Sequence, residues 1–239
     1  MNTFKRLLPS RFKSHILGYL SSILGESLID FLKASFIVRS KFNYIFQTKC
    51  FDDRQILWSH LFEHISNSSL LFLEFGVWEG ASVEYISSLN SNLTSHFVGF
   101  DSFEGLPSKW LGKNAGYFST DGKVPQINDD RISFVKGWFQ VTLPHFLSNN
   151  PYQFDELVVH YDADLYSSTL FCLAQISLVC MPYYAIFDEF TGDECRALYD
   201  YSLASGCSVE FLGYTLSSRS RLPNQVICRI SPPNANTIS

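Results

Sequence analysis

Acidic side chains lie at or beside the ends of four apolar runs in this chain of 239 residues. Continuous apolar runs of this kind are typical of strands that are buried on both faces of a parallel sheet. In such sheets the carboxyl ends of the strands form the edge where ligands bind. We therefore expect four carboxylates on that edge, namely those of Glu74, Asp101, Asp162 and Asp188.

The first run leads into a glycine-containing turn, Glu74-Phe75-Gly76-Val77-Trp78-Glu79-Gly80, and then into an expected helix. A strand, a glycine turn and a helix start together make a nucleotide-type pocket, because glycine lets a ligand approach the backbone closely. Trp78 occupies the place of the second glycine of a dinucleotide fingerprint. The turn therefore favours a ligand without phosphates, although a plain tight connection between strand and helix has the same pattern.

Asp101 ends the second run, where an acid is placed to accept hydrogen bonds from both hydroxyls of a ribose. A capping aspartate before a turn is the alternative interpretation. Further along the chain, His160, Asp162 and Asp164 alternate at the end of another expected strand. Asp164 and Asp162 are candidate general bases, and His160 is either a third candidate or a buried structural histidine.

Expected strands and helices alternate from residue 70 to residue 205, which predicts an open, mostly parallel α/β sheet with helices on both faces. Two late strands have no helix between them and are expected to pair antiparallel. The seven expected strands are residues 70–75, 96–100, 132–135, 157–161, 183–187, 209–212 and 225–230. The expected helices are residues 52–66, 80–89, 140–148, 169–179 and 193–205.

The net charge of −5 argues against a general nucleic-acid-binding protein. The charge is unevenly distributed, because residues 1–49 carry eight Lys and Arg against two acids, whereas the rest of the chain carries 21 acids against ten bases. We predict a basic amphipathic helical extension over residues 1–50 and one globular domain over residues 51–239. The extension is expected to pack on the domain or on a second subunit of a homo-oligomer, with contact to an anionic membrane as the alternative.

The sequence predicts neither a membrane span nor a disulfide framework. Residues 165–187 carry no Asp, Glu, Lys or Arg, but Pro182 interrupts them, which favours a buried helix followed by a buried strand. The six cysteines lack metal-binding spacing, and several lie inside apolar stretches. Reduced, buried thiols predict a cytoplasmic protein.

Residues 104–130 form a long stretch that is rich in Gly, Pro, Ser, Asn and Asp. A loop of that length inside a compact domain is usually functional, often as a lid. Aromatic residues in and after this loop are candidates for a wall against a sugar ring, or for packing of the lid itself. They are Trp110, Tyr117, Phe118 and Trp138.

The turn from Glu74 to Gly80, followed by Gly99-Phe100-Asp101-Ser102-Phe103-Glu104-Gly105-Leu106-Pro107, resembles class I S-adenosylmethionine-dependent methyltransferases. The subgroup that it resembles most is the macrocin O-methyltransferase-like family. The resemblance implies a Rossmann-like fold over about residues 52–230 and methyl transfer to a hydroxyl of a sugar or a sugar-containing metabolite. Three later segments are similar to that family's in the same order, namely residues 136–144, 160–169 and 187–190.

The resemblance implies roles in binding S-adenosylmethionine. Asp101 would hold the ribose, and its neighbours Ser102 and Phe103 would flank the adenine. The methionine end of the cofactor would lie against the first turn and the helix that follows it. The residues expected there are Glu74, Gly76, Trp78, Gly80 and Ser82.

The resemblance also implies a divalent metal, usually magnesium, bound by Asp162, Asp188 and Glu189. Oxygen donors of this kind suit magnesium or calcium, and no His/Cys set suits zinc. Such an ion would clamp two vicinal oxygens of the acceptor and favour its alkoxide. Glu189 departs from the family pattern, because many members have a second aspartate at that position.

Two rival functions fit parts of the same pattern. A nicotinamide-dependent sugar-modifying oxidoreductase or epimerase would use a similar sheet, but Trp78 in place of a glycine and the lack of a Tyr-x-x-x-Lys pair count against it. A non-catalytic scaffold that binds S-adenosylmethionine would keep the pocket without the chemistry, and Glu189 in place of an aspartate favours that interpretation.

Overall fold

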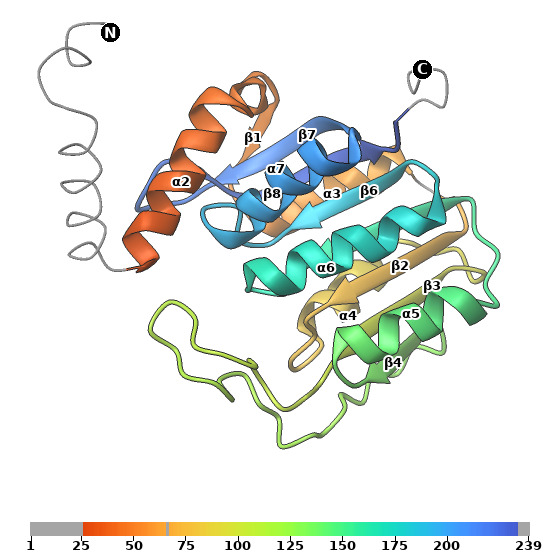
Figure 1. Ribbon diagram of the computed structural model, residues 1–239. Helices are drawn as coiled ribbons and strands as arrows, with labels where there is room; N and C mark the ends of the chain where they lie inside the picture. The colour runs from red at the N-terminus through yellow and green to blue at the C-terminus, as the bar shows by residue number, and fades with distance from the viewer. Residues whose placement is uncertain (1–25, 66, 234–239) are drawn as a thin grey trace, which may run out of the picture.

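The computed structural model describes residues 26–65 and 67–233, which form one eight-stranded sheet with helices on both faces (Figure 1). The strand order is β1-β7-β8-β6-β5-β2-β3-β4. The strands are β1 (Lys49–Phe51), β2 (Leu70–Phe75), β3 (His96–Asp101), β4 (Ile132–Lys136), β5 (Glu156–Tyr161), β6 (Tyr183–Phe187), β7 (Ser208–Leu216) and β8 (Pro223–Ser231).

Strands β4, β3, β2, β5 and β6 run parallel, whereas β8 is antiparallel to both β6 and β7. The antiparallel pair predicted for the end of the chain is therefore confirmed. The chain lays β3 and β4 on one side of β2 and then β5 and β6 on the other side. This reversal places the switch point, where ligands bind in such sheets, between β2 and β5.

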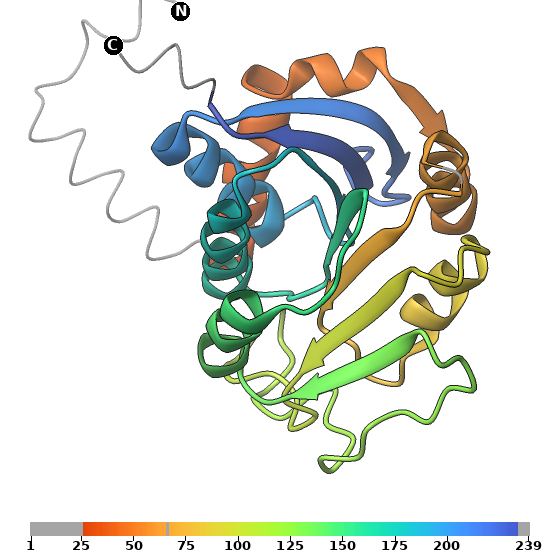
Figure 2. The same cartoon turned by 90° about the vertical axis from the view of Figure 1, so that its right-hand side faces the viewer.

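Helices cover both faces of the sheet, as Figure 2 shows. Helices α2, α5, α6 and α7 pack on one face, and α3 and α4 pack on the other. No helix within residues 26–65 and 67–233 is long and apolar enough to cross a membrane. The helices are α2 (Glu26–Ser40), α3 (Arg54–His64), α4 (Ala81–Ser88), α5 (Phe139–Asn149), α6 (Tyr166–Ile176) and α7 (Asp193–Ser205), with short 3-10 helices η2 (Asn43–Gln47) and η3 (Ser177–Val179).

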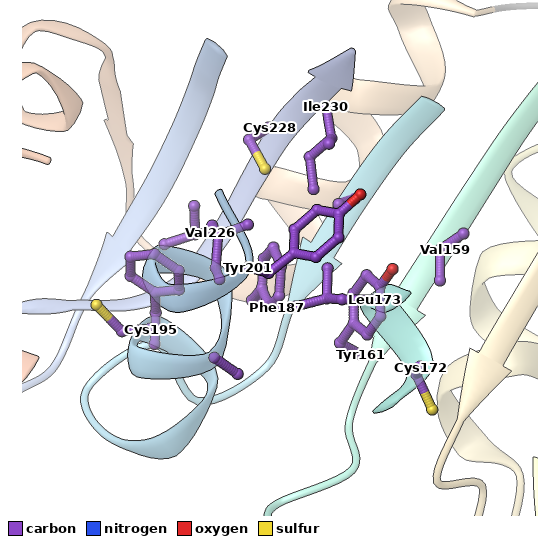
Figure 3. Close-up of a cluster of buried hydrophobic side chains, with 14 of the residues drawn as sticks. Val159, Tyr161, Cys172, Leu173, Phe187, Cys195, Tyr201, Val226, Cys228 and Ile230 are labelled. Carbon is purple, nitrogen blue, oxygen red and sulfur yellow. The ribbon is translucent and has the colours of Figure 1, made fainter. Parts of the chain in front are cut away.

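Alternation of side chains along the strands divides the apolar core into two layers. On β2, Leu71 and Leu73 belong to the layer that α5, α6 and α7 cover, whereas Leu70 and Phe72 belong to the layer under α3 and α4. Figure 3 shows part of the first layer, where side chains of β5, β6 and β8 pack against α6 and α7. Both faces of β2 are therefore buried, as its continuous apolar sequence predicts.

The sheet has eight strands rather than the seven predicted, because residues 49–51 add β1 parallel to β7. A strand of three residues is too short to show a periodic pattern in the sequence. The predicted boundary between extension and domain, at residue 50, falls inside this strand. Residues 1–25 of the predicted extension lie outside the described residues.

The central predicted elements agree closely with the structure. The strands at 70–75 and 183–187 and the helix at 193–205 have the predicted bounds. The uncharged segment 165–187 divides into α6, η3 and β6, which confirms a buried helix followed by a buried strand. Helix α6 begins at Tyr166, before the predicted residue 169.

The segment from α2 to β1 is part of the main core. Phe42 is buried, and its ring centre lies 6.2 Å from that of Phe190 and 5.3 Å from that of Phe211. Arg196 on α7 donates from Nη1 to Oδ1 of Asp30 on α2 at 2.6 Å. These contacts join the first described helix to the last helix and the late strands of the sheet.

We predict that Phe42→Ala lowers the free energy of unfolding by about 3–5 kcal/mol, because it removes a buried ring and leaves a cavity. Urea denaturation of the full chain measures this change. The matched control is Phe36→Ala on α2, whose side chain is 63% exposed, and which should change stability by less than about 0.5 kcal/mol. Equal effects of the two substitutions would contradict the packing of this segment on the core.

Candidate active site

A cavity of about 440 Å³ opens at the carboxyl ends of β2, β3, β5 and β6. Its volume lies in the range of pockets that enclose small-molecule ligands. The walls come from the turn after β2, the end of β3, the 104–130 loop, the start of α5, and the segments that follow β5 and β6. Of the four acids predicted for this edge, Asp101, Asp162 and Asp188 line the cavity, and Glu74 does not.

Gly76 begins the turn after β2 with a φ of +96°, a backbone conformation that favours glycine. A Cβ atom at this position would overlap the carbonyl oxygen of Asp162. The Gly76 N–H donates to the carbonyl of Phe100 at 3.0 Å, and the Asp162 N–H donates to that of Phe75 at 3.0 Å. The ends of β2, β3 and β5 are thus joined so closely that only glycine fits between them.

The carboxylate of Asp101 holds the turn after β2 in place. Its Oδ2 accepts hydrogen bonds from the N–H groups of Val77 at 2.8 Å and Trp78 at 2.9 Å. Its Oδ1 accepts one from the N–H of Phe103 at 2.8 Å. A carboxylate has about four lone-pair sites, and these three bonds leave one on Oδ1, so Asp101 can support the turn and still accept from a ligand in the cavity.

The structure brings five of the eight predicted cofactor residues to the cavity wall, namely Gly76, Trp78, Ser82, Asp101 and Ser102. The other three lie elsewhere. Glu74 points into the layer under α3 and α4, because it alternates with the residues that face the other layer. A Cβ atom added at Gly80 would contact the side chains of Pro125 and Ile127. The Phe103 ring is fully buried, with its centre 6.3 Å from that of Phe134.

Four carboxyl groups gather on the side of the cavity formed by the ends of β5 and β6. They are those of Asp162, Asp164, Asp188 and Glu189. Burial, followed by the charge of Asp188, raises the pKa of Asp162 well above its usual value. The same two causes raise the pKa of Glu189, which Lys113 partly offsets. Like charges that are close together and desolvated favour protonation or a bound cation.

Asp164 is suited to exchange a proton near neutral pH. Burial and the neighbouring charge of Glu189 raise its pKa to about 7, although Lys113 acts in the opposite direction. Its φ of +59° places it in the left-handed region, where aspartate is tolerated better than bulkier residues. A general base works best when its pKa lies near the operating pH, so this environment fits the predicted role of Asp164.

Asp188 is fixed by its neighbours. The Nε2 of Gln225 on β8 donates to its Oδ1 at 2.8 Å, and Nη1 of Arg54 on α3 lies 3.7 Å from the same oxygen. The Asp188 N–H donates to the carbonyl of Tyr161 at 3.1 Å. Two elements, α3 and β8, therefore orient this carboxylate, and β5 fixes its backbone; nothing in the sequence indicated Arg54 or Gln225.

Glu194 at the start of α7 is a further acid of the site, and no sequence pattern indicated it. It is 1% exposed, and its Oε2 accepts from the N–H of Glu189 at 2.9 Å. Its Oε1 is buried without a hydrogen-bond partner. Burial, followed by the charge of Asp188, raises its pKa well above the usual value. In the sequence it resembles an ordinary acid in the first turn of a helix, so no local signal distinguishes it.

His160 and Glu74 form a buried pair across neighbouring strands. They are aligned in the β2–β5 register, both are fully buried, and His160 Nδ1 lies 2.8 Å from Glu74 Oε1. A ring nitrogen of His160 and one carboxylate oxygen each from Asp162 and Asp188 lie within 4.8 Å of one another. Among the described residues this is the group whose donor atoms converge as metal ligands do.

These residues fit a divalent cation, because two carboxylates and an imidazole converge and a buried His160 nitrogen has no partner. Glu189, predicted as the third metal ligand, lines the cavity but stands outside the group of three. It follows Asp188 directly in the chain, and successive residues at a strand end project in different directions. His160, predicted as a candidate base, lies behind the cavity wall.

The 104–130 loop forms one wall of the cavity. Its backbone folds on itself, since the Leu106 N–H donates to the carbonyl of Tyr117 at 2.9 Å. Of the predicted aromatic wall, Trp110, Phe118 and Trp138 line the cavity, and Tyr117 does not. Lys113 places its Nζ 4.6 Å from the ring centre of Trp110 and 4.2 Å from that of Phe118. This cation–aromatic cluster faces the acids of β5 and β6.

Comparison with known proteins agrees with this arrangement. The family model described as macrocin O-methyltransferase (TylF) matches residues 70–207, more than half of the chain. This chain belongs to that family. The match runs from β2 to the end of α7 and includes the cavity residues of the strand ends. The sheet with helices on both faces and the Rossmann-like class predicted from the sequence are confirmed.

One curated relative is the 8-demethyl-8-(2,3-dimethoxy-α-L-rhamnosyl)-tetracenomycin-C 4'-O-methyltransferase of Streptomyces olivaceus. It is 27% identical over 159 residues, which are 57% of this chain and 59% of that protein. The chain thus matches a little under three fifths of the relative's length.

Two solved structures share the fold. CalS11, a calicheamicin methyltransferase, has 18% identity and a TM-score of 0.50, with 96% of each chain covered. An O-methyltransferase from Bacillus cereus, solved in complex with SAH, has 13% identity and a TM-score of 0.50, with 90% of this chain and 96% of that chain covered. At these identities the likeness is one of fold.

We predict that Glu194→Gln stabilises the metal-free protein increasingly as the pH rises above about 4.3, the usual pKa of an unfolded glutamate. In this window the unfolded state loses the proton that the folded state keeps, so wild-type stability falls with pH. Gln removes that proton linkage and keeps an oxygen to accept from Glu189.

Thermal unfolding from pH 4 to pH 8 in the presence of a chelator measures the difference. The two proteins should be similar at the acidic end and diverge toward the alkaline end. Glu210→Gln, at an exposed position of β7, is the matched control and should show no such divergence. A constant difference at every pH would contradict the assigned environment of Glu194.

Proposed function

We propose that this protein transfers the methyl group of S-adenosylmethionine to a hydroxyl of a sugar or a sugar-containing metabolite, with the help of a divalent metal. The observation that carries the proposal is that Asp101 and the acids that follow β5 and β6 line one cavity, in a chain of the macrocin O-methyltransferase family. One wall suits a nucleoside and the other suits cations and an ionisable acceptor.

The nucleoside side is built by the turn after β2 and the end of β3. Asp101 keeps a lone pair on Oδ1 for a ribose hydroxyl while it holds the turn. Gly76 lets the ligand approach the backbone of the turn, and Ser102 borders the adenine end of the same wall. S-adenosylmethionine supplies the positively charged sulfonium whose methyl group is transferred.

The acceptor side is built by the residues that follow β5 and β6. Asp164, with a pKa of about 7, takes the proton of the acceptor hydroxyl. Asp162 and Asp188 would hold a divalent cation of the magnesium class, which lowers the pKa of a bound hydroxyl. Gln225 and Arg54 keep Asp188 in one orientation for this purpose, and the buried strand ends exclude water behind it.

Aromatic side chains support a sugar as the acceptor. Trp110, Phe118 and Trp138 provide flat apolar surfaces beside the acids, and pockets of this mixed kind suit ligands with an apolar ring face and polar edges. The relative from Streptomyces olivaceus is named as a 4'-O-methyltransferase of a rhamnosyl-tetracenomycin. We therefore propose a glycoside or an activated deoxysugar with vicinal hydroxyls as the substrate class.

We predict that Asp101→Asn weakens binding of S-adenosylhomocysteine by about 10- to 100-fold, since a hydrogen bond to a charged group is worth about 1.5–3 kcal/mol. Isothermal titration calorimetry measures this affinity. Asp130→Asn, at an exposed position that is not part of the cavity lining, is the control and should bind as the wild type does. Failure of the wild type to bind this ligand would refute the proposed function.

We predict that Asp164→Asn lowers turnover by about 10²- to 10⁴-fold, the range expected for loss of a general base, while S-adenosylhomocysteine affinity stays near that of the wild type. Methylated product from a panel of rhamnosides and other glycosides is measured by mass spectrometry. Chelation should abolish turnover, and added divalent metal should restore it.

Asp52→Asn, at an exposed position before α3, is the matched control and should retain full turnover. Undiminished turnover in Asp164→Asn would refute the base assignment. Tight cofactor binding by the wild type without any turnover across the panel would instead favour a non-catalytic scaffold.

A further inference from the structure

The Glu74–His160 pair is buried in an apolar layer of the core, where polar side chains are unusual. Trp58 of α3 packs edge-on against the imidazole at 5.6 Å between ring centres, and Phe72 lies 6.4 Å away on the other strand. Both members of the pair are fully buried. Uncompensated polar groups are unfavourable in such a layer, so the pair is expected to serve the site beside it.

The hydrogen bond between Glu74 and His160 uses one imidazole nitrogen and leaves the other without a partner. Nδ1 of His160 lies 2.8 Å from Oε1 of Glu74, a distance at which an imidazole N–H donates to a carboxylate. With Nδ1 carrying the proton, Nε2 presents a lone pair. This Nε2 is buried and has no hydrogen-bond partner among the described residues.

A ring nitrogen of His160 and carboxylate oxygens of Asp162 and Asp188 lie within 4.8 Å of one another. Because Glu74 occupies Nδ1, Nε2 is the nitrogen that is left to bind a ligand. We propose that His160, through Nε2, is the third protein ligand of the metal site, in place of Glu189. The inference rests on the metal site of the proposed function and adds to it a nitrogen ligand and a change of metal preference.

Glu74 is a positioning residue in this arrangement. Histidines that bind metals usually donate their other ring N–H to a carboxylate, which fixes the tautomer and makes the ligating nitrogen more basic. The register of β2 and β5 places Glu74 opposite His160, so the sheet itself fixes the pair. The acid that resembles a cofactor residue in the sequence thus acts on the metal side of the cavity.

A nitrogen ligand changes which metal the site selects. Sites made only of carboxylate and water suit magnesium, calcium and manganese, whereas imidazole suits the later first-row transition metals. An imidazole in place of a carboxylate therefore predicts a larger preference for Co²⁺ and Mn²⁺ over Mg²⁺ than an all-carboxylate site would have. Within the transition metals, affinity should rise from Mn²⁺ to Co²⁺.

The decisive experiment is pulsed electron paramagnetic resonance of the full chain loaded with Mn²⁺. A directly bound imidazole nitrogen produces a nuclear modulation that changes when histidine is labelled with ¹⁵N. We expect this modulation in the wild type, and its change on labelling. Wild-type Mn²⁺ binding without a histidine nitrogen signal would overturn the proposal, and this measurement needs no variant.

Variants extend the test to the positioning residue. Mn²⁺ affinity, measured by calorimetry, should fall by about 10- to 100-fold in Glu74→Gln and by at least as much in His160→Asn, with a smaller preference for Mn²⁺ over Mg²⁺ in both. His145→Asn, exposed on α5, is the matched control and should leave both values unchanged. A greater loss in Glu189→Gln than in His160→Asn would overturn the assignment.

Failure of this inference is distinguishable from failure of the proposed function. Titration of each protein with S-adenosylhomocysteine reports the folded cofactor site without any metal. A wild type that binds this ligand but neither Mn²⁺ nor Co²⁺ would overturn the metal site and leave the S-adenosylmethionine site standing. A wild type that binds Mn²⁺ through His160 but not S-adenosylhomocysteine would preserve the ligand assignment and refute the transferase.

Discussion

The ends of β2 and β5 approach each other so closely at Gly76 that a side chain there would overlap the Asp162 carbonyl oxygen. The rest of the site depends on this contact. It joins the turn that carries Val77 and Trp78 to the segment that carries Asp162 and Asp164, with no layer of side chains between them. The cofactor wall and the acidic wall therefore face one cavity, and their separation is set by backbone rather than by flexible side chains.

The same closeness makes the site electrostatically demanding. Asp162, Asp164 and Glu189 are desolvated beside one another, and their pKa values rise as a result. Arg54 and Lys113 also line this cavity, but the acids outnumber them. This excess of negative charge is complementary to positive ligands, and both the sulfonium of the proposed cofactor and a divalent metal are positive. Part of the excess of acids in the body of the chain is thus concentrated at this cavity, where it favours positive ligands.

The wall opposite the strand ends is organised by the 104–130 loop. The loop is long but ordered, because its backbone forms hydrogen bonds within the loop and to the carbonyl of Phe103. Lys113, surrounded by Trp110 and Phe118, brings a positive charge and apolar rings to the same place. An acceptor entering the cavity would meet this cluster on one side and the acids on the other.

Much of the fold follows from local patterns in the sequence. The buried strands at 70–75 and 183–187 are continuous apolar runs, the glycine turn after β2 needs Gly76, and Asp101, Asp162 and Asp188 mark strand ends that parallel pairing brings to one edge. These features depend on residues close together in the chain, so local propensity and spacing determine them. The short strand β1 was not predicted, because it forms only by pairing with β7, which is distant in the sequence.

Tertiary structure alone decided which side chains meet at the edge. Glu74 looked like a cofactor residue, yet alternation on a doubly buried strand turns it away from the cavity and toward His160, 86 positions away. Glu194, Gln225 and Arg54 reach the acids from three separate elements without any local signature. Sequence determined the strands and their terminal acids, whereas register and packing across the sheet decided the partners, because those contacts join residues that spacing cannot relate.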